Sequence, residues 1–160
     1  MTKQKGFTLI EILIYAGLTT AITAFAVLAV YSMIDYAERG RYHRELVENH
    51  KMLEQKIYWA LQNNSAINNP QSGATTTILS VDKLSYGSNP VVLDVLASTT
   101  ARLKLGAAAA QPITNETILV RDLNFRRSDV SGQPVIIVKG ELFEPFTSTT
   151  VEIMTTIPVK

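Results

Sequence analysis

The longest apolar stretch of the chain runs from Phe7 to Ile34 and holds one charged residue, Glu11. Crossing the hydrocarbon core of a membrane takes about 20 helical residues at 1.5 Å each, and this stretch is longer. A core helix of a soluble protein would show polar residues every three or four positions, which this stretch lacks. Its other polar interruptions are mainly hydroxyl side chains, which can bond the helix's own carbonyl groups: Thr8, Thr19, Thr20, Thr23 and Ser32.

We therefore expect residues 7–34 to form a single membrane-crossing helix. Lys3 and Lys5 precede it, so the positive-inside rule keeps residues 1–6 in the cytoplasm and sends the rest of the chain outward. An ordinary cleaved secretory signal is the competing interpretation, with Ala24-Phe25-Ala26 as its cleavage site. Two features argue against it: Glu11 would lie inside the apolar region of the signal, and the stretch continues past Ala26 to Ile34.

A second, amphipathic helix pattern covers residues 35–62. Apolar residues recur at helical spacing and predict one buried stripe, widened by Val47, Tyr58 and Ala60. Asn49 and the charged residues fall on the other faces. No proline interrupts the chain between Phe7 and Gln62. The stripe itself consists of Leu46, His50, Leu53, Ile57 and Leu61.

Strands follow the helix. The Asn-, Pro- and Gly-rich segment 62–74 predicts a loop, and residues 106–112 are also expected to be a loop. A hairpin is expected around residues 97–99, and a turn at 129–132. We predict an α+β fold in which the long N-terminal helix packs on one antiparallel sheet spanning about residues 75–159. The expected strands are 75–81, 90–96, 100–105, 116–125, 134–142 and 150–159.

Composition adds few constraints on function. The formal net charge is +1, which gives no electrostatic argument for binding nucleic acid or an anionic membrane surface. The absence of cysteine excludes a disulfide framework and thiolate chemistry. The length of 160 residues suits one domain plus an appendage.

The stretch Lys5-Gly6-Phe7-Thr8-Leu9-Ile10-Glu11 resembles the N-terminal signature of type IV pilins and of the pseudopilins of type II secretion. A short basic leader ends in glycine, an aromatic residue follows, and a glutamate stands in an otherwise uncharged apolar segment. The likeness covers about the first 30 residues. Beyond them the chain is similar to the family in plan, with an extended helix and then an antiparallel sheet.

The resemblance implies a leader at residues 1–6, an assembly helix at 7–34 and a globular domain at 35–160. A prepilin peptidase of the bacterial inner membrane would cut between Gly6 and Phe7 and methylate the new amine of Phe7. An assembly platform and its ATPase would then pack the subunit into a filament with other pilin or pseudopilin subunits. The globular domain would lie outside the membrane.

Within this resemblance, Glu11 is interpreted as an assembly residue. An α-amino group has a pKa of about 7.7–8, so the amine of Phe7 would be mostly cationic at neutral pH. Burying either charge alone is costly, whereas Glu11 of one subunit beside the Phe7 amine of another neutralises both and sets the axial register. The alternative is a carboxylate protonated in lipid or reaching to the interface.

Two departures from many major pilins favour a minor pilin or pseudopilin, or a lineage without disulfides. The apolar segment lacks a central proline, with Leu28 in that region, so we expect a regular helix. The chain also has no cysteines for a disulfide near its C-terminus.

Other candidate sites are weaker. His43 and His50 share a helix face, with Glu54 as a further carboxylate, but we expect no metal or cofactor site. Arg126 and Arg127, beside Phe125, are interpreted as a solvated strand end, although DNA contact stays open. The glycosylation sequon Asn115-Glu116-Thr117 is taken as coincidence.

No arrangement of catalytic residues is recognised, so we expect a structural subunit rather than an enzyme. The alternative function is a signal-anchored protein that does not polymerise and carries an extracytoplasmic binding domain.

Overall fold

The computed structural model describes residues 8–97, 99–130 and 132–159. Within these residues one helix, α1 (Leu9–Leu61), is followed by nine strands. The described chain divides into two compact units, one reaching to Arg41 and the other beginning at Tyr42. Every buried apolar side chain of the core belongs to the second unit, from Leu46 to Val159. The fold class is therefore α+β, as the sequence predicts.

The first unit contains the apolar part of α1, which is one uninterrupted α-helix through Gly17 and Gly40. This continuity confirms the regular helix expected from the missing proline. The helix is long and apolar enough to cross a membrane, and none of its apolar stretch is buried inside the structure. Such a surface suits an environment of lipid or of other apolar helices.

The second unit begins with the last five turns of α1, whose buried face matches the expected stripe. Leu46, Leu53, Ile57 and Leu61 are at most 1% exposed. Two details of the prediction were wrong. Asn49 is buried instead of lying on a polar face, and Tyr58 is 41% exposed instead of widening the apolar stripe.

Asn49 is buried because it holds the segment after β6 onto the helix. Its Oδ1 accepts from the backbone N–H of Asn115 at 2.9 Å. One turn earlier, Glu45 Oε1 accepts from Asn115 Nδ2 and Thr117 Oγ1, each at 2.9 Å. We call these three hydrogen bonds the 45–49 clamp. The first of them satisfies the buried side-chain oxygen of Asn49, and the other two join Glu45 to more exposed side chains.

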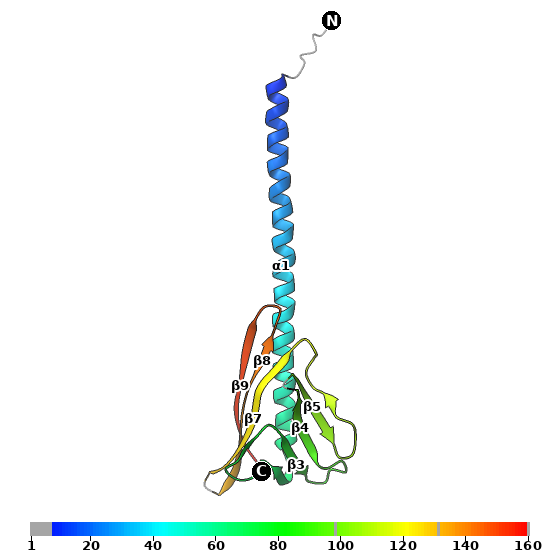
Figure 1. Cartoon of the computed structure of the whole chain (residues 1–160), viewed down its shortest axis with the longest axis vertical. Coiled ribbons are helices and arrows are strands. Elements are labelled where there is room, and N and C mark those ends of the chain that lie inside the picture. The colour runs from blue at the N-terminus through cyan, green and yellow to red at the C-terminus, as the bar shows by residue number, and fades with distance from the viewer. Residues whose placement is uncertain (1–7, 98, 131, 160) are drawn as a thin grey trace. The chain divides into compact units, whose positions relative to one another are not determined.

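The strands form two antiparallel sheets rather than the single sheet that we expected (Figure 1). The five-stranded sheet has the order β1 (Asn64–Asn69), β3 (Leu79–Lys83), β4 (Val91–Leu96), β5 (Thr100–Leu105) and β6 (Gln111–Pro112). The four-stranded sheet has the order β2 (Thr75–Thr76), β7 (Leu119–Val130), β8 (Gln133–Glu144) and β9 (Thr149–Pro158). Both sheets contribute buried residues to one core with residues 46–61 of α1.

The expected loops are partly wrong. Within segment 62–74, Asn64–Asn69 forms β1 because it pairs with β3. Two register shifts make this pairing irregular but do not prevent it. Within segment 106–112, Gln111–Pro112 forms β6 and pairs with Leu103 and Arg102. Both expected hairpins are present, since β4 pairs with β5 and β7 with β8.

The end of α1 is fixed by contacts from β3. Asn63 adopts a left-handed conformation with φ of 54°, which stops the helix. Lys83 Nζ donates to the carbonyl oxygens of Trp59 and Gln62 and lies 4.7 Å from the centre of the Trp59 ring. A cation at this end of the helix also offsets the partial negative charge of its last carbonyls.

A β-bulge explains the irregular apolar pattern of β7. Arg121 pairs with Glu141 and Asn124 with Lys139, so Asp122 and Leu123 together oppose Gly140. Asp122 has a φ of 50° and absorbs the extra residue. The bulge shifts the phase of the strand by one position. Because of that shift, three side chains separated by three and then two residues all reach the core: Val120, Leu123 and Phe125.

Gly140→Ala should destabilise the second unit. A Cβ at this position would lie 2.9 Å from both Cα and Cδ1 of Leu123, so the bulge itself would have to move. We expect a loss of about 1–3 kcal/mol in the free energy of unfolding, measured by chemical denaturation of the full chain in detergent. Gly87→Ala is the control, because a Cβ there meets nothing within 4 Å. Equal effects of the two substitutions would contradict this account of the bulge.

Candidate functional site

The N-terminus of α1 is closed by a reciprocal pair of residues, Thr8 and Glu11. Thr8 Oγ1 accepts from the backbone N–H of Glu11 at 3.4 Å. In return, Glu11 Oε2 accepts from the backbone N–H of Thr8 at 3.3 Å and lies 3.4 Å from its hydroxyl. This is a capping box, in which two groups that a helix start leaves unpaired satisfy each other.

The capping box gives Glu11 a local role that our sequence analysis missed. The signal was present, because Ser or Thr followed three residues later by Glu at the start of an apolar run is typical of such a cap. Acidic side chains in the first helical turn also favour the positive end of the helix dipole. The predicted cleavage site, Gly6 and Phe7, and the predicted methylation of Phe7 lie outside the described residues.

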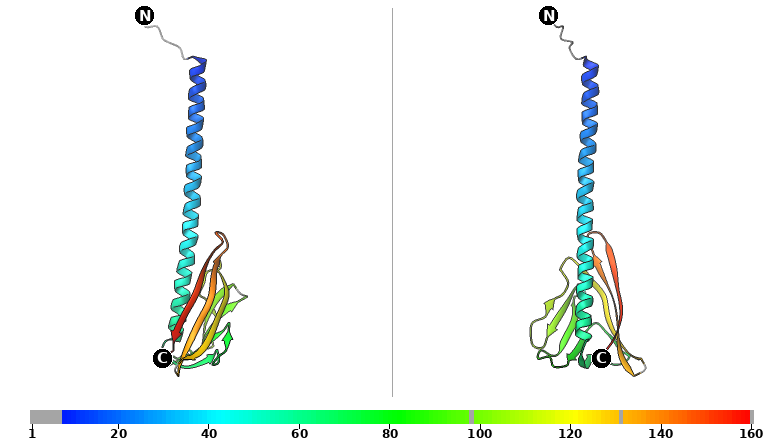
Figure 2. Two further views of the ribbon diagram at one scale, coloured as in Figure 1. Left: turned by 90° about the vertical axis from the view of Figure 1, so that its left-hand side faces the viewer. Right: turned by 180° about the vertical axis from the view of Figure 1, so that it is seen from behind.

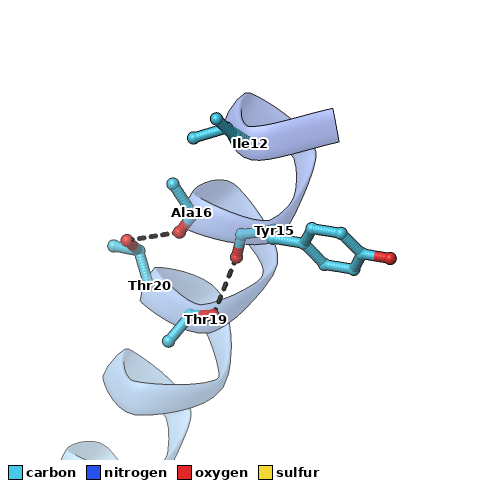
Figure 3. Close-up of a pocket in the computed structure, with 5 residues that line it drawn as sticks. All are labelled: Ile12, Tyr15, Ala16, Thr19 and Thr20. Carbon is cyan, nitrogen blue, oxygen red and sulfur yellow. Dashed lines mark hydrogen bonds between the residues drawn. The ribbon is translucent and has the colours of Figure 1, made fainter. Parts of the chain in front are cut away.

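The surface of α1 beyond the cap consists of exposed apolar side chains and internally bonded hydroxyls. Thr19 and Thr20 donate to the carbonyl oxygens of Tyr15 and Ala16, each at 2.8 Å (Figure 3). Thr23 and Ser32 do the same at 2.8 and 2.9 Å. Each hydroxyl therefore donates without any partner outside the helix, which is what an apolar environment requires.

A shallow hollow lies on this surface between the first three turns. Ile12, Ala16 and Thr20 project from one side of the helix, whereas the ring of Tyr15 points away from them (Figure 3). The small side chains of Ala16 and Thr20 lower the surface between larger neighbours. Small residues at such positions let a second helix approach closely. The arrangement suits helix packing, and the hollow is too open to enclose a small molecule.

The structure also places the residues of the weaker candidate sites, the two histidines and the two arginines. His50 Nδ1 lies 3.8 Å from Glu54 Oε2, whereas His43 is exposed. Among the residues that the structure describes, no group of three His, Cys, Asp or Glu side chains has a geometry for metal binding. Arg126 and Arg127 lie inside β7 rather than at a strand end, because that strand continues to Val130 and has β2 and β8 as neighbours.

Arg127 is paired with Asp129 of the same strand. Arg127 Nε donates to Asp129 Oδ1 at 3.4 Å. The hydroxyl of Ser72 donates to the other carboxylate oxygen of Asp129, and this bond lowers the pKa of Asp129. These contacts attach the segment before β2 to the end of β7.

Two further groups that make contacts within the fold have shifted pKa values. Burial lowers the pKa of Lys83, which bonds the last carbonyls of α1. The hydrogen bond from Arg102 to Asp94 joins neighbouring strands at 2.7–2.9 Å and raises the pKa of Arg102.

Glu144 is the most buried carboxylate among the described residues, at 2% exposure. Its two oxygens accept from the backbone N–H groups of Phe146 at 2.7 Å and Thr147 at 2.6 Å, and from the Thr147 hydroxyl. Burial opposes its ionisation, but these three hydrogen bonds outweigh burial and lower the pKa of Glu144. The carboxylate thereby organises the turn between β8 and β9, where Phe146 stacks on Tyr42 with ring centres 4.6 Å apart.

Replacing Glu144 by glutamine should weaken the fold at neutral pH and flatten its pH dependence in acid. The pKa is lower in the folded chain, so this stabilisation is complete above the unfolded pKa and is lost as pH falls through the folded pKa. We expect Glu144→Gln to cost about 1–3 kcal/mol at pH 7 and progressively less toward pH 3.

Denaturant unfolding between pH 3 and pH 7 measures this effect, with Glu116→Gln as an exposed control. A constant difference between the wild-type chain and Glu144→Gln across that range would contradict the predicted ionisation.

Comparison with known proteins identifies no relative. The chain matches no family model, no curated protein and no solved structure.

Proposed function

We propose that the chain is a structural subunit of a filament of the type IV pilus or type II pseudopilus kind. The observation that carries this proposal is Glu11, a carboxylate at the start of a long helix whose apolar stretch is not buried inside the described structure. The N-terminal sequence around Gly6 and Phe7 supports the same assignment. The absence of a kink in α1 favours a minor pilin or a pseudopilin.

In this proposal Glu11 has two successive partners. Before assembly, the capping box with Thr8 supplies hydrogen bonds that reduce the cost of holding the carboxylate at the membrane. Cleavage after Gly6 creates a cationic amine on Phe7. Pairing that amine with Glu11 of a neighbouring subunit removes two charges from an apolar environment at once, and the exposed surface of α1 packs on other helices.

The same proposal assigns the location and the partners. The chain waits in the bacterial inner membrane as a single-pass protein with its second unit outside. Prepilin peptidase, the assembly platform with its ATPase, and other pilin or pseudopilin subunits are its partners. The second unit presents the filament surface, and no catalytic step is assigned to it.

Co-expression with a prepilin peptidase tests the processing step. We expect the mature chain to begin at Phe7 with a methylated amine, read directly by mass spectrometry of the intact protein. A peptidase variant without its catalytic aspartates is the control and should leave Met1 or Thr2 at the N-terminus. A cut near Ala26 would instead indicate an ordinary secretory signal, and an uncut chain would favour the non-polymerising anchored protein.

Substitution of Glu11 tests the assembly step. Glu11→Ala leaves the Phe7 amine without a partner, which costs roughly 3 kcal/mol, or about a hundredfold in incorporation into filaments. Incorporation is measured as the filament-bound fraction after shearing, in cells that supply the assembly machinery.

Thr8→Val is the matched control for this experiment. It removes the capping hydroxyl, at a cost of about 1 kcal/mol to the helix start, but leaves the carboxylate available to a neighbour. We expect it to assemble. If Thr8→Val failed as completely as Glu11→Ala, the local cap rather than the pairing between subunits would explain the role of Glu11.

A further inference from the structure

The second unit has four strands at the ends of its sheets, and three of them are poor templates for another strand. β2 and β6 have two residues each, and β6 contains Pro112. β1 is irregular, with two register shifts along its pairing with β3. Short strands, proline and bulges are the devices by which proteins prevent unwanted pairing at sheet edges.

β9 has none of these devices before its last residue, Pro158. Its ten residues pair with β8 without any register shift, from Thr149↔Glu144 to Pro158↔Val135. Seven of the ten are β-branched, Glu152 carries its one charge, and proline stands only at its last position. Among the described residues, no strand pairs with its other side. β9 runs along one side of the unit in both the front and the rear views, with the lower ends of β7 and β8 reaching farther outward (Figures 1 and 2).

One face of β9 contacts the core and α1, and the other face is exposed. Ile153 and Ile157 are buried in the core, and the Thr155 hydroxyl lies 3.2 Å from the hydroxyl of Tyr58 on α1. On the opposite face Met154 is 73% exposed. What remains unused is the backbone along the outer side of the strand, a row of N–H and C=O groups that another extended backbone matches.

Charge on the outer face indicates what such a strand would carry. Glu152 on β9 lies directly opposite Glu141 on β8, where like charges repel, while Arg121 on β7 occupies the position on the far side of Glu141. Both line a shallow groove that Asp122 and Lys139 also line. A lysine or arginine placed on the far side of Glu152 by an added strand would offset that repulsion.

We propose that the outer edge of β9 binds an extended segment of a different protein, which adds a fifth strand to the four-stranded sheet and places a basic residue beside Glu152. A second copy of the chain fits less well. Its own β9, the long free edge among the described strands, carries Glu152 as its one charge and offers no basic residue to place beside the Glu152 of another copy. The inference concerns the second unit and does not depend on filament assembly.

A synthetic peptide as long as β9 tests the proposal with the full chain in detergent. The probe alternates valine and threonine and carries one central lysine; its first control has glutamate in place of lysine. A second control keeps the lysine sequence but has alternate backbone amides methylated, so it cannot pair as a strand. Binding is measured by fluorescence anisotropy, and protection of β9 amides by hydrogen exchange.

We expect the lysine peptide to bind about fivefold more tightly than the glutamate peptide, to protect the outer amides of β9, and to lose binding when methylated. Glu152→Lys should invert the preference between the two peptides, and Glu116→Lys should leave it unchanged.

Equal binding of the methylated peptide would overturn edge pairing. A preference that Glu152→Lys does not invert would overturn the role of Glu152. β9 amides already protected in a dimer of the chain would assign the edge to a second copy.

Discussion

The structure depends on the backbone hydrogen bonding of one uninterrupted helix that is exposed along its apolar stretch and buried on one face nearer its end. A helix satisfies its own N–H and C=O groups, so it can pass from an apolar medium to a protein core without changing conformation. Only the side chains change along it. Toward the N-terminus they are apolar on all sides, and hydroxyls such as those of Thr19 and Ser32 donate back to the helix. From Leu46 onward one face is buried and the others are polar.

The sequence was informative wherever a single periodic signal dominated. The apolar stretch predicts a helix that can cross a membrane, and the recurrence of Leu46, Leu53 and Ile57 predicts the face that packs on the sheets. Two hairpins also follow from short turns between strand-like segments. In each case the residues that decide the structure are close together in the chain, so local spacing is enough to identify them.

Features that depend on distant partners could not be predicted in this way. Nothing local indicates that β2 pairs with β7 instead of its neighbour β3, and this choice divides the strands into two sheets. The apolar spacing in β7 was visible as an irregularity, but its cause is the absence of a side chain at Gly140. At the candidate site, by contrast, the feature that was missed is a local one. The capping box of Thr8 and Glu11 is local, but Glu11 was interpreted through a neighbouring subunit or the lipid and not through Thr8.

The 45–49 clamp has a mechanical consequence. Glu45 and Asn49 lie on one face of α1, and their three hydrogen bonds reach Asn115 and Thr117 on the connection between the two sheets. Turning the helix by a single residue, about 100°, would carry both side chains away from that connection and break all three bonds together. The clamp thus fixes the rotation of α1 about its axis relative to the connection between the two sheets. A rotation of the buried turns of α1 would therefore pull on that connection and on both sheets.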